Sequence, residues 1–162
     1  MNDKSDRKLK ALIADDSASI RVLLSHTLTK MGYEVVECTN GTEVWKYIRK
    51  GEHFNIFILD WVMPGLSGVE LCKKIRQSNT AGYQYILLLT GHKDLAPPLE
   101  TIKRLSIQGY CEKSDRFDQL LLLIESGIKS ISQMNIIKEI NEELKDTYEK
   151  LENAYMESIE TL

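Results

Sequence analysis

The chain has few of the residues that mark a cross-linked or membrane-embedded protein. Its 162 residues include only 3 cysteines, 3 prolines and 7% aromatic residues. The cysteines, Cys38, Cys72 and Cys111, form no C-x-x-C pair, so neither a disulfide framework nor a zinc site is predicted. We expect them to be buried thiols in a reducing compartment. The longest apolar runs, at 54–59 and 85–89, are too short to span a bilayer.

The sequence also lacks a strong excess of one charge. With 21 basic and 24 acidic residues the formal net charge is −3, which disfavours direct binding of nucleic acid. The N-terminal MNDKSDRK has no apolar stretch of the kind a signal peptide needs. The length fits one domain of about 100–200 residues with a modest appendage. These features together predict a cytoplasmic protein without a membrane segment.

Five short apolar runs alternate with helical patterns over the first 128 residues. The runs lie at 9–14, 33–37, 55–59, 84–89 and 106–111, and the helices are expected at 18–31, 42–50, 69–75, 95–105 and from 115 onward. Ser17 is expected to cap the first helix through its hydroxyl, and Pro97 and Pro98 to occupy the first turn of the fourth. Nearly uniform apolar strands are buried on both faces, so the pattern predicts a doubly wound, five-stranded parallel α/β sheet.

The composition changes after residue 128. Residues 129–162 contain no glycine or proline and carry 4 basic and 8 acidic side chains, a net charge of −4. Apolar residues recur there at steps of three or four, which predicts one long amphipathic helix. These residues are Ile137, Ile140, Leu144, Tyr148, Leu151, Tyr155, Ile159 and Leu162. A strict heptad would place Thr147, Ala154 and Thr161 in the second core position, a weak coiled-coil core. Self-association, a following domain or the chain's own domain could cover the apolar face.

Polar residues follow the predicted strands where each one ends. Asp15 and Asp16 follow the first strand, Asp60 the third, Thr90 the fourth and Lys113 the fifth. The carboxyl ends of parallel strands meet at one edge, where such sheets bind ligands. Any one of these residues could be a turn or capping residue. Together, three carboxylates in one place would repel one another unless a cation neutralised them, and carboxylate oxygens are the ligands that Mg²⁺ prefers.

The strings that contain these residues resemble the receiver domain of two-component response regulators, over residues 8–128. They are LIADDS at 12–17, LDWVMPGLSG at 59–68, LLLTG at 87–91 and GYCEK at 109–113. The pattern D-x-x-M-P-G-x-S-G, which begins at Asp60, is the most specific of them. The resemblance implies a (βα)5 flavodoxin-like fold and a phosphorylatable signalling domain rather than an enzyme.

The resemblance also implies roles for the acidic residues. Asp60 would be the phosphoacceptor, taking a phosphoryl group from a sensor histidine kinase, a phosphotransfer protein or a small phosphodonor. Asp16, Asp60 and the main-chain carbonyl of Val62 would bind Mg²⁺ (or Mn²⁺) directly, and Asp15 would assist through water. An ionised carboxylate needs no general base to act as the nucleophile.

The resemblance further implies a switch. Thr90 and Lys113 would contact the phosphoryl oxygens, and movement of Thr90 would leave space for Tyr110, which matches the switch aromatic of the family. The face formed by the fourth helix, fifth strand and fifth helix would carry the signal. Val62 and His92 would flank the path of the attacking water and tune hydrolysis of the acyl phosphate. Because Val62 offers no hydrogen bond to water, a persistent phosphoryl group is expected.

Two features depart from the family pattern. Ser114 follows Lys113 where the family usually has proline, and Pro97-Pro98 stands at the start of the fourth helix. The loop after the fifth strand and the signalling face are therefore expected to differ from those of relatives.

The end of the tail, KLENAYMESIETL, resembles the linkers that precede HD-type cyclic-dinucleotide phosphodiesterase and diguanylate cyclase domains. No GGDEF-like string or His-Asp metal pair occurs in these 162 residues. The predicted partners are thus a second copy bound through the helix, giving a homodimer, and an output domain beyond residue 162. One alternative is a degenerate receiver that acts as a phosphorylation-independent binding platform. An Asp-nucleophile phosphohydrolase is disfavoured, because it would need a second Asp where Val62 stands.

Overall fold

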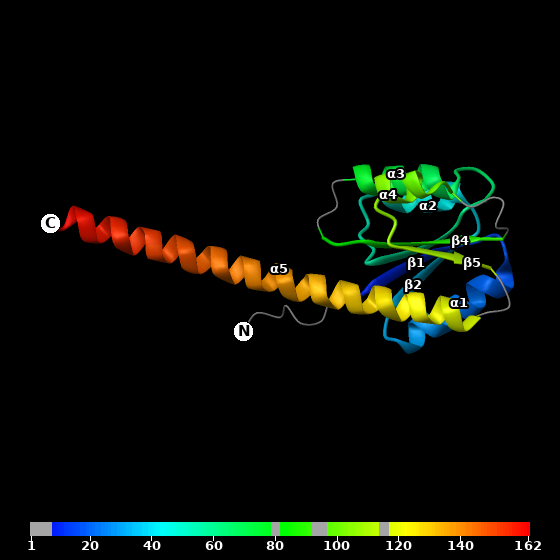
Figure 1. The fold of residues 1–162 in the computed structure, drawn as a ribbon, viewed down its shortest axis with the longest axis horizontal. Helices are drawn as coiled ribbons and strands as arrows, with labels where there is room; N and C mark the ends of the chain where they lie inside the picture. Colours follow the sequence, from blue (N-terminus) through cyan, green and yellow to red (C-terminus); the bar gives the residue numbers. More distant parts are fainter. Residues whose placement is uncertain (1–7, 79–81, 92–96, 114–116) are drawn as a thin grey trace.

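A computed structural model describes residues 8–78, 82–91, 97–113 and 117–162 as a three-layer α/β domain with one long projecting helix (Figure 1). The strands are β1 (Lys10–Ala14), β2 (Glu34–Cys38), β3 (Ile56–Asp60), β4 (Tyr85–Thr90) and β5 (Gly109–Glu112). The helices are α1 (Ala18–Lys30), α2 (Gly41–Arg49), α3 (Gly68–Gln77), α4 (Leu99–Arg104) and α5 (Phe117–Glu160). All strand pairs are parallel, in the order β2-β1-β3-β4-β5. The predicted doubly wound sheet is confirmed.

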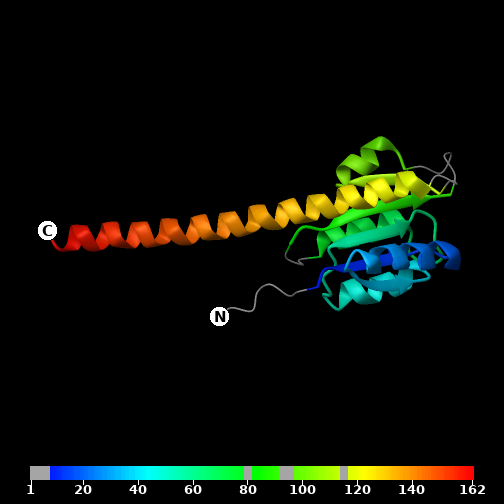
Figure 2. The same ribbon diagram turned by 90° about the horizontal axis from the view of Figure 1, so that it is seen from below.

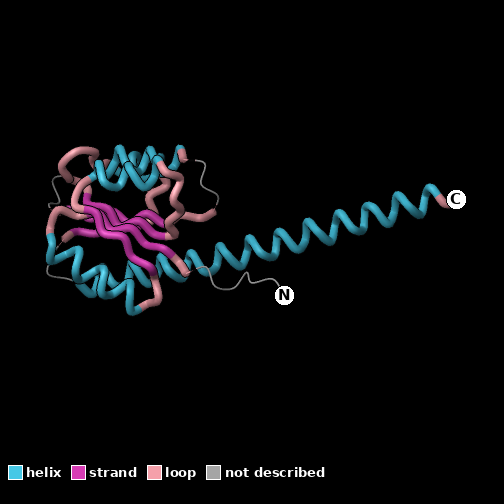
Figure 3. Tube along the Cα trace, turned by 180° about the vertical axis from the view of Figure 1, so that it is seen from behind, coloured by secondary structure: helices cyan, strands magenta, loops and turns pink. Residues whose placement is uncertain are grey.

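Two hydrophobic cores lie on opposite faces of the sheet, because successive strand residues point to alternate faces. Phe57 and Leu59 of β3 pack with α2 and α3 on one face, whereas Ile56 and Ile58 pack with α1 and α5 on the other. The tube representation in Figure 3 shows these helices on either side of the strands. The three cysteines are buried and free, as expected. Burial raises the pKa of Cys38 and Cys72 to about 12, which keeps both thiols protonated and unreactive.

The starts of α1 and α3 differ in how they are capped. Ser67 caps α3 in a full capping box with Glu70. Ser17 stands at the N-cap of α1, but among the described residues its side chain makes no capping hydrogen bond, so that prediction is wrong. Its backbone N–H instead donates to Asp15 Oδ1 at 2.8 Å, and its hydroxyl pairs with Ser19.

The fourth helix and fifth strand are shorter than predicted. The prolines precede α4 instead of occupying its first turn: Pro98 is the N-cap, with an extended backbone that its ring favours. Residues 95 and 96 of the predicted helix lie outside the described residues. The strand predicted from 106 starts at Gly109, because Ser106 has a φ of 51° and turns the chain after α4.

The long C-terminal helix is confirmed as one element of 44 residues, α5. Its first part packs on the sheet, with Ile124, Gly127 and Ile131 buried, and the rest extends well past the domain (Figure 2). By length and composition alone, one 18-residue window of α5 could cross a membrane. That is weak evidence, because core helices of soluble proteins pass the same test.

Candidate functional site

The candidate site lies at the carboxyl edge of the sheet, where the chain leaves β1 and β3 in opposite directions. Strand order reverses there, because β1 is flanked by β2 on one side and by β3 on the other. Asp15 and Asp16 follow β1, and Asp60 is the last residue of β3. Thr90 ends β4, and Lys113 directly follows β5. The sheet therefore brings all five predicted residues to one edge.

Three carboxylates form the acidic part of the site. One oxygen each from Asp15, Asp16 and Asp60 lies within 4.8 Å of the others. Asp15 is 0% and Asp60 4% exposed, whereas Asp16 faces solvent. The buried Asp15 Oδ2 lies 2.7 Å from the ammonium nitrogen of Lys113. Three carboxylates at this spacing fit a divalent cation such as Mg²⁺.

Lys113 is the shared counter-ion of the two buried carboxylates. Its Nζ lies 2.7 Å from Asp15 Oδ2 and 2.7 Å from Asp60 Oδ2. Burial disfavours the charged ammonium, but hydrogen bonds to both carboxylates outweigh burial and raise the pKa of Lys113. The side chain thus stays a cation at neutral pH and holds its charge between the two acids.

At Asp60, unlike at Lys113, the surroundings disfavour the charged form of the side chain. Burial raises the pKa of its carboxyl, and the negative charge of Asp15 raises it further. The hydrogen bond from Lys113 and the backbone N–H of Val62, 3.3 Å from Asp60 Oδ1, work against this shift without cancelling it. A solvent-exposed carboxylate would therefore ionise more readily than Asp60 does in the metal-free site. A bound cation would favour the ionised form.

The loop after β3 is held close to the site by glycines. A Cβ on Gly68 would lie 2.7 Å from the carbonyl oxygen of Asp60, so a larger residue would push the chain away. Gly65 has a φ of +81°, and a Cβ there would lie 2.6 Å from Thr42 Oγ1. Val62 is 56% exposed at the mouth of the site. The turn at Gly65 fixes the path of the chain beside Asp60.

The ends of β4 and β5 are coupled. The backbone N–H of Lys113 donates to the carbonyl of Thr90 at 2.6 Å. Thr90 is 1% exposed, and its side chain is hydrogen bonded to that of Tyr110. Burial and the charge of Glu112 raise the pKa of Tyr110, which keeps its hydroxyl protonated. The residues expected to act as a switch are thus in direct contact.

Arg21 was missed by the sequence analysis. Its Nη1 donates to the carbonyl oxygen of Asp15 at 2.7 Å, which holds the backbone between the two adjacent acids. An arginine one turn into the helix that follows an acidic pair is the signal that could have identified it. His92 and Ser114, both singled out in the sequence, lie outside the described residues.

Comparison with known proteins defines the family. A model of the response regulator receiver domain matches residues 11–125. A chemotaxis protein CheY homologue of Campylobacter jejuni is 33% identical over 96 residues, which cover 59% of this chain and 74% of that protein. The chain belongs to the response regulator receiver family. It is a signalling domain of the two-component type, and the phosphohydrolase and binding-platform alternatives are not favoured.

Solved structures agree with this assignment. Response regulator TrrA of Thermotoga maritima, in complex with Mg²⁺ and BeF, has a TM-score of 0.61 and 31% identity, covering 74% of this chain and 98% of that chain. An adenylate cyclase structure from Rhodopirellula baltica has a TM-score of 0.67 and 26% identity, covering 85% of this chain and 98% of that chain.

Proposed function

We propose that Asp60 accepts a phosphoryl group from a sensor histidine kinase or a phosphotransfer protein, and that residues 8–128 form the receiver. The observation that carries the proposal is the placement of Lys113 Nζ, 2.7 Å from both Asp15 Oδ2 and Asp60 Oδ2. It puts a fixed cation beside the nucleophile, where charge develops on the transferred group. Phosphoryl transfer depends mainly on such positioning and charge neutralisation.

In this reaction a carboxylate oxygen of Asp60 bonds to phosphorus while the bond from phosphorus to the donor's histidine nitrogen breaks. The leaving imidazole keeps the electron pair, and Asp60 becomes an acyl phosphate. Lys113 stays protonated and pairs with a phosphoryl oxygen, and Thr90 donates its hydroxyl to another. Residue 62 is a valine, which has no acidic group to complete the turnover that a phosphohydrolase needs. The product of the reaction is therefore the phosphorylated chain, which acts as the signal.

The resident cation is proposed to be Mg²⁺ (or Mn²⁺), held by Asp16, Asp60 and the main-chain carbonyl of Val62, with Asp15 assisting through water. When bound, the ion would screen the negative charge that gathers between the acids and the phosphoryl group. The close carboxylate oxygens and the exposure of Asp16 to solvent support this assignment.

Output is proposed to run from Thr90 to Tyr110 and then to the face formed by α4, β5 and α5. Because the two side chains are already hydrogen bonded, withdrawal of Thr90 toward a phosphoryl group would release Tyr110. Shifting a switch from 1:99 to 99:1 needs about 5.5 kcal/mol. A few charge-assisted hydrogen bonds of about 1.5–3 kcal/mol each would supply it.

The protein is proposed to be cytoplasmic and to form a homodimer through residues 129–162 of α5, which are exposed from residue 132 onward. The exposed apolar side chains along this helix support pairing. An HD-type phosphodiesterase or diguanylate cyclase output domain beyond residue 162 is proposed from the resemblance of the tail to the linkers of such proteins. No direct contact with nucleic acid is proposed, since the tail is acidic.

The test is incubation of the chain with a radiolabelled phosphohistidine donor or acetyl phosphate, with and without Mg²⁺. Incorporation should require Mg²⁺ and should be lost in Asp60→Ala, while Asp146→Ala on the tail serves as the matched control. Sedimentation with beryllofluoride and Mg²⁺ should show an Asp60-dependent change in mass or shape. Absence of label from the wild type would leave the degenerate binding platform as the better account.

A further inference from the structure

Eight of the exposed apolar residues of α5 repeat every eleven positions, whereas Met134, Ile136 and Met156 lie outside this repeat. Ile137, Tyr148 and Ile159 form one series, Ile140, Leu151 and Leu162 a second, and Leu144 and Tyr155 a third. Eleven residues in three turns is about 3.67 per turn, close to the 3.6 of an α-helix, whereas a heptad is 3.5. The eight side chains therefore form a nearly straight stripe, which we call the eleven-residue stripe.

This stripe does not face the receiver. The residues of α5 that pack on the sheet are Ile124, Gly127 and Ile131. At about 100° per residue, the centre of the stripe lies about 120° around the helix from these three. Its members from Ile137 to Ile159 are 47% to 68% exposed. Ile137, at the start of the stripe, borders the groove beside Tyr83. From Ile140 onward the chain's own domain leaves the stripe uncovered.

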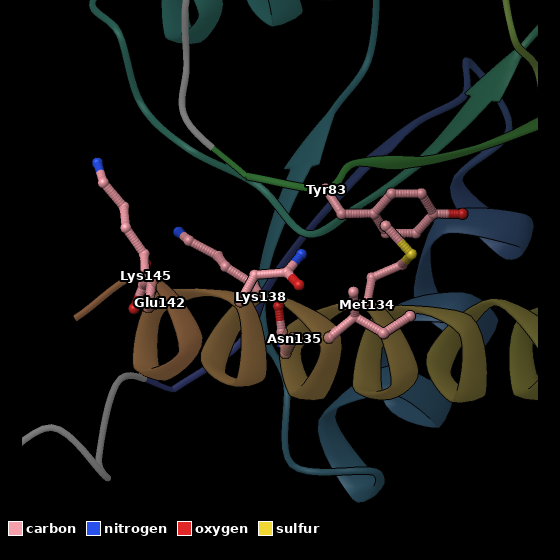
Figure 4. A pocket seen from close by; sticks show the side chains of 8 residues that line it. Tyr83, Met134, Asn135, Lys138, Glu142 and Lys145 are labelled. Atoms are coloured by element: carbon pink, nitrogen blue, oxygen red, sulfur yellow. The ribbon is translucent and has the colours of Figure 1, made fainter. Parts of the chain in front are cut away.

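The side of α5 that continues the receiver-facing surface becomes polar instead. An open groove of about 390 Å³ lies where the helix leaves the domain, between Tyr83 and the helix. Figure 4 shows Lys138, Glu142 and Lys145 along this groove, past Met134. Before about residue 134 the apolar side of the helix packs on its own sheet. After this point the apolar residues lie on a different side of the helix, which does not face the sheet.

The charges of the helix are kept off the stripe. In the fully described segment 134–162, no charged residue lies within about 60° of the centre of the stripe. Only Asn141 and Ser158 among polar residues do so. The acidic excess therefore faces away from anything that covers the stripe, and two copies can pair without bringing their carboxylates together. An anionic membrane surface is a poor alternative, because the opposite face is acidic and not basic.

We infer that a second copy of this chain covers the eleven-residue stripe, with Tyr148 and Leu151 in the contact and Thr147 at its margin. This rests on the proposed pairing through the tail and specifies its seam: a nearly straight eleven-residue packing instead of a left-handed heptad coiled coil. A heptad would bring Thr147 inward, about 70° from the centre of the stripe. In the proposed seam Thr147 lies outside the contact, whereas the neighbouring Tyr148 is buried in it.

Single cysteines test the seam, because the three native cysteines are buried. Tyr148→Cys and Leu151→Cys lie near the middle of the stripe, so they should form intermolecular disulfides whether the helices run parallel or antiparallel. Under mild oxidation of the full chain, we expect each to cross-link at least tenfold faster than Thr147→Cys and than Glu149→Cys on the opposite face. Sedimentation of the unmodified chain should show a dimer, which Leu144→Asp should dissociate and Glu149→Gln should not.

The outcomes separate the seam from the proposed function. A dimer in which Thr147→Cys cross-links as fast as Tyr148→Cys overturns the seam but leaves pairing through the tail. A chain that stays monomeric overturns both, while Mg²⁺-dependent labelling of Asp60 is measured independently. Equal rates at all four positions would mean random collision and would also overturn the seam.

Discussion

The ammonium nitrogen of Lys113 lies 2.7 Å from Asp60 Oδ2, although the two residues are 53 positions apart in the chain. The same nitrogen is equally close to Asp15 Oδ2. One lysine is therefore the internal counter-ion of two buried carboxylates in the metal-free site. This shared ion pair determines how the loss of charge at Lys113 or at Asp60 changes the stability of the fold.

Removing that counter-ion should destabilise the protein. Lys113→Ala leaves two buried acids unpaired, and breaking a buried ion pair costs about 3–5 kcal/mol. We expect a loss near the lower end, since solvent reaches the site beside Asp16. Saturating Mg²⁺ should restore part of the loss, because the ion replaces the missing charge. Thermal unfolding with and without Mg²⁺ measures both effects, with Lys150→Ala on the tail as the control. Equal melting temperatures for Lys113→Ala and wild type would contradict the pairing.

Removing the charge of Asp60 should have the opposite effect. Because burial and then Asp15 raise the pKa of Asp60 in the fold, ionisation is unfavourable there. A raised folded-state pKa gives stability that is complete below the unfolded pKa of about 3.9 and is lost as pH rises through the folded value. At pH 7 without metal, the free energy of unfolding of Asp60→Asn should therefore be higher than that of the wild type by roughly 1 kcal/mol, which corresponds to about 2–4 °C in Tm.

This gain should shrink as the pH falls and should vanish below the unfolded pKa of about 3.9, where the wild-type Asp60 becomes protonated in both states. Melting curves across that range check the trend, and Glu157→Gln on the exposed helix should show neither the gain nor its pH dependence. An Asp60→Asn variant less stable than wild type at pH 7 would mean that the hydrogen bond from Lys113 outweighs burial.

Cation binding should be visible in tryptophan fluorescence. Trp61 directly follows Asp60, and the chain has only 2 tryptophans. Titration with Mg²⁺ should change the emission, and the change should vanish in Trp61→Phe but persist in Trp45→Phe. Asp16→Asn should weaken the apparent affinity by at least about 10-fold, the loss typical of an outer-shell partner, since it removes a charged ligand that would bind the ion directly. A titration in which Asp16→Asn matches wild type would remove Asp16 from the ligand set.

The acyl phosphate on Asp60 should be long-lived. Val62 lies exposed at the mouth of the site, and its side chain cannot orient a water for attack. Decay of labelled protein should take minutes or longer, and Val62→Asn, which supplies a polar group, should shorten the half-life. Val62→Leu is the matched apolar control. Decay of the wild type within seconds would show that another group directs the water.

Tyr110 should couple phosphorylation to output. In Tyr110→Ala the side chain can no longer respond to Thr90, so beryllofluoride should bind yet leave sedimentation unchanged. Tyr110→Phe keeps the ring and loses only the hydrogen bond to Thr90, so it should retain a partial response. If Tyr110→Ala responds like wild type, the signal leaves the site by another route.

The sequence alone determined the layers of this fold and the members of its site. Uniform apolar runs such as Ile56–Leu59 indicate strands that are buried on both faces. Asp15, Asp60 and Lys113 come at the ends of such runs, and the carboxyl ends of parallel strands meet at one edge of the sheet. The eight apolar residues of the tail likewise predicted the long helix, because a helical period is visible locally. Each of these features depends on neighbours in the chain.

Tertiary contact decided the rest. The turn that ends α4 is held by Arg76 of α3, whose guanidinium donates to the carbonyls of Leu105 and Ser106. Arg21 reaches the carbonyl of Asp15 only because α1 packs beside the end of β1. The raised pKa of Asp60 depends on burial and on the carboxylate that β1 brings beside it. The spacing of the apolar residues alone predicts an apolar stripe along the tail. Only the packing of Ile131 against the sheet fixes where that stripe points, because a helix has no preferred face until part of it is buried.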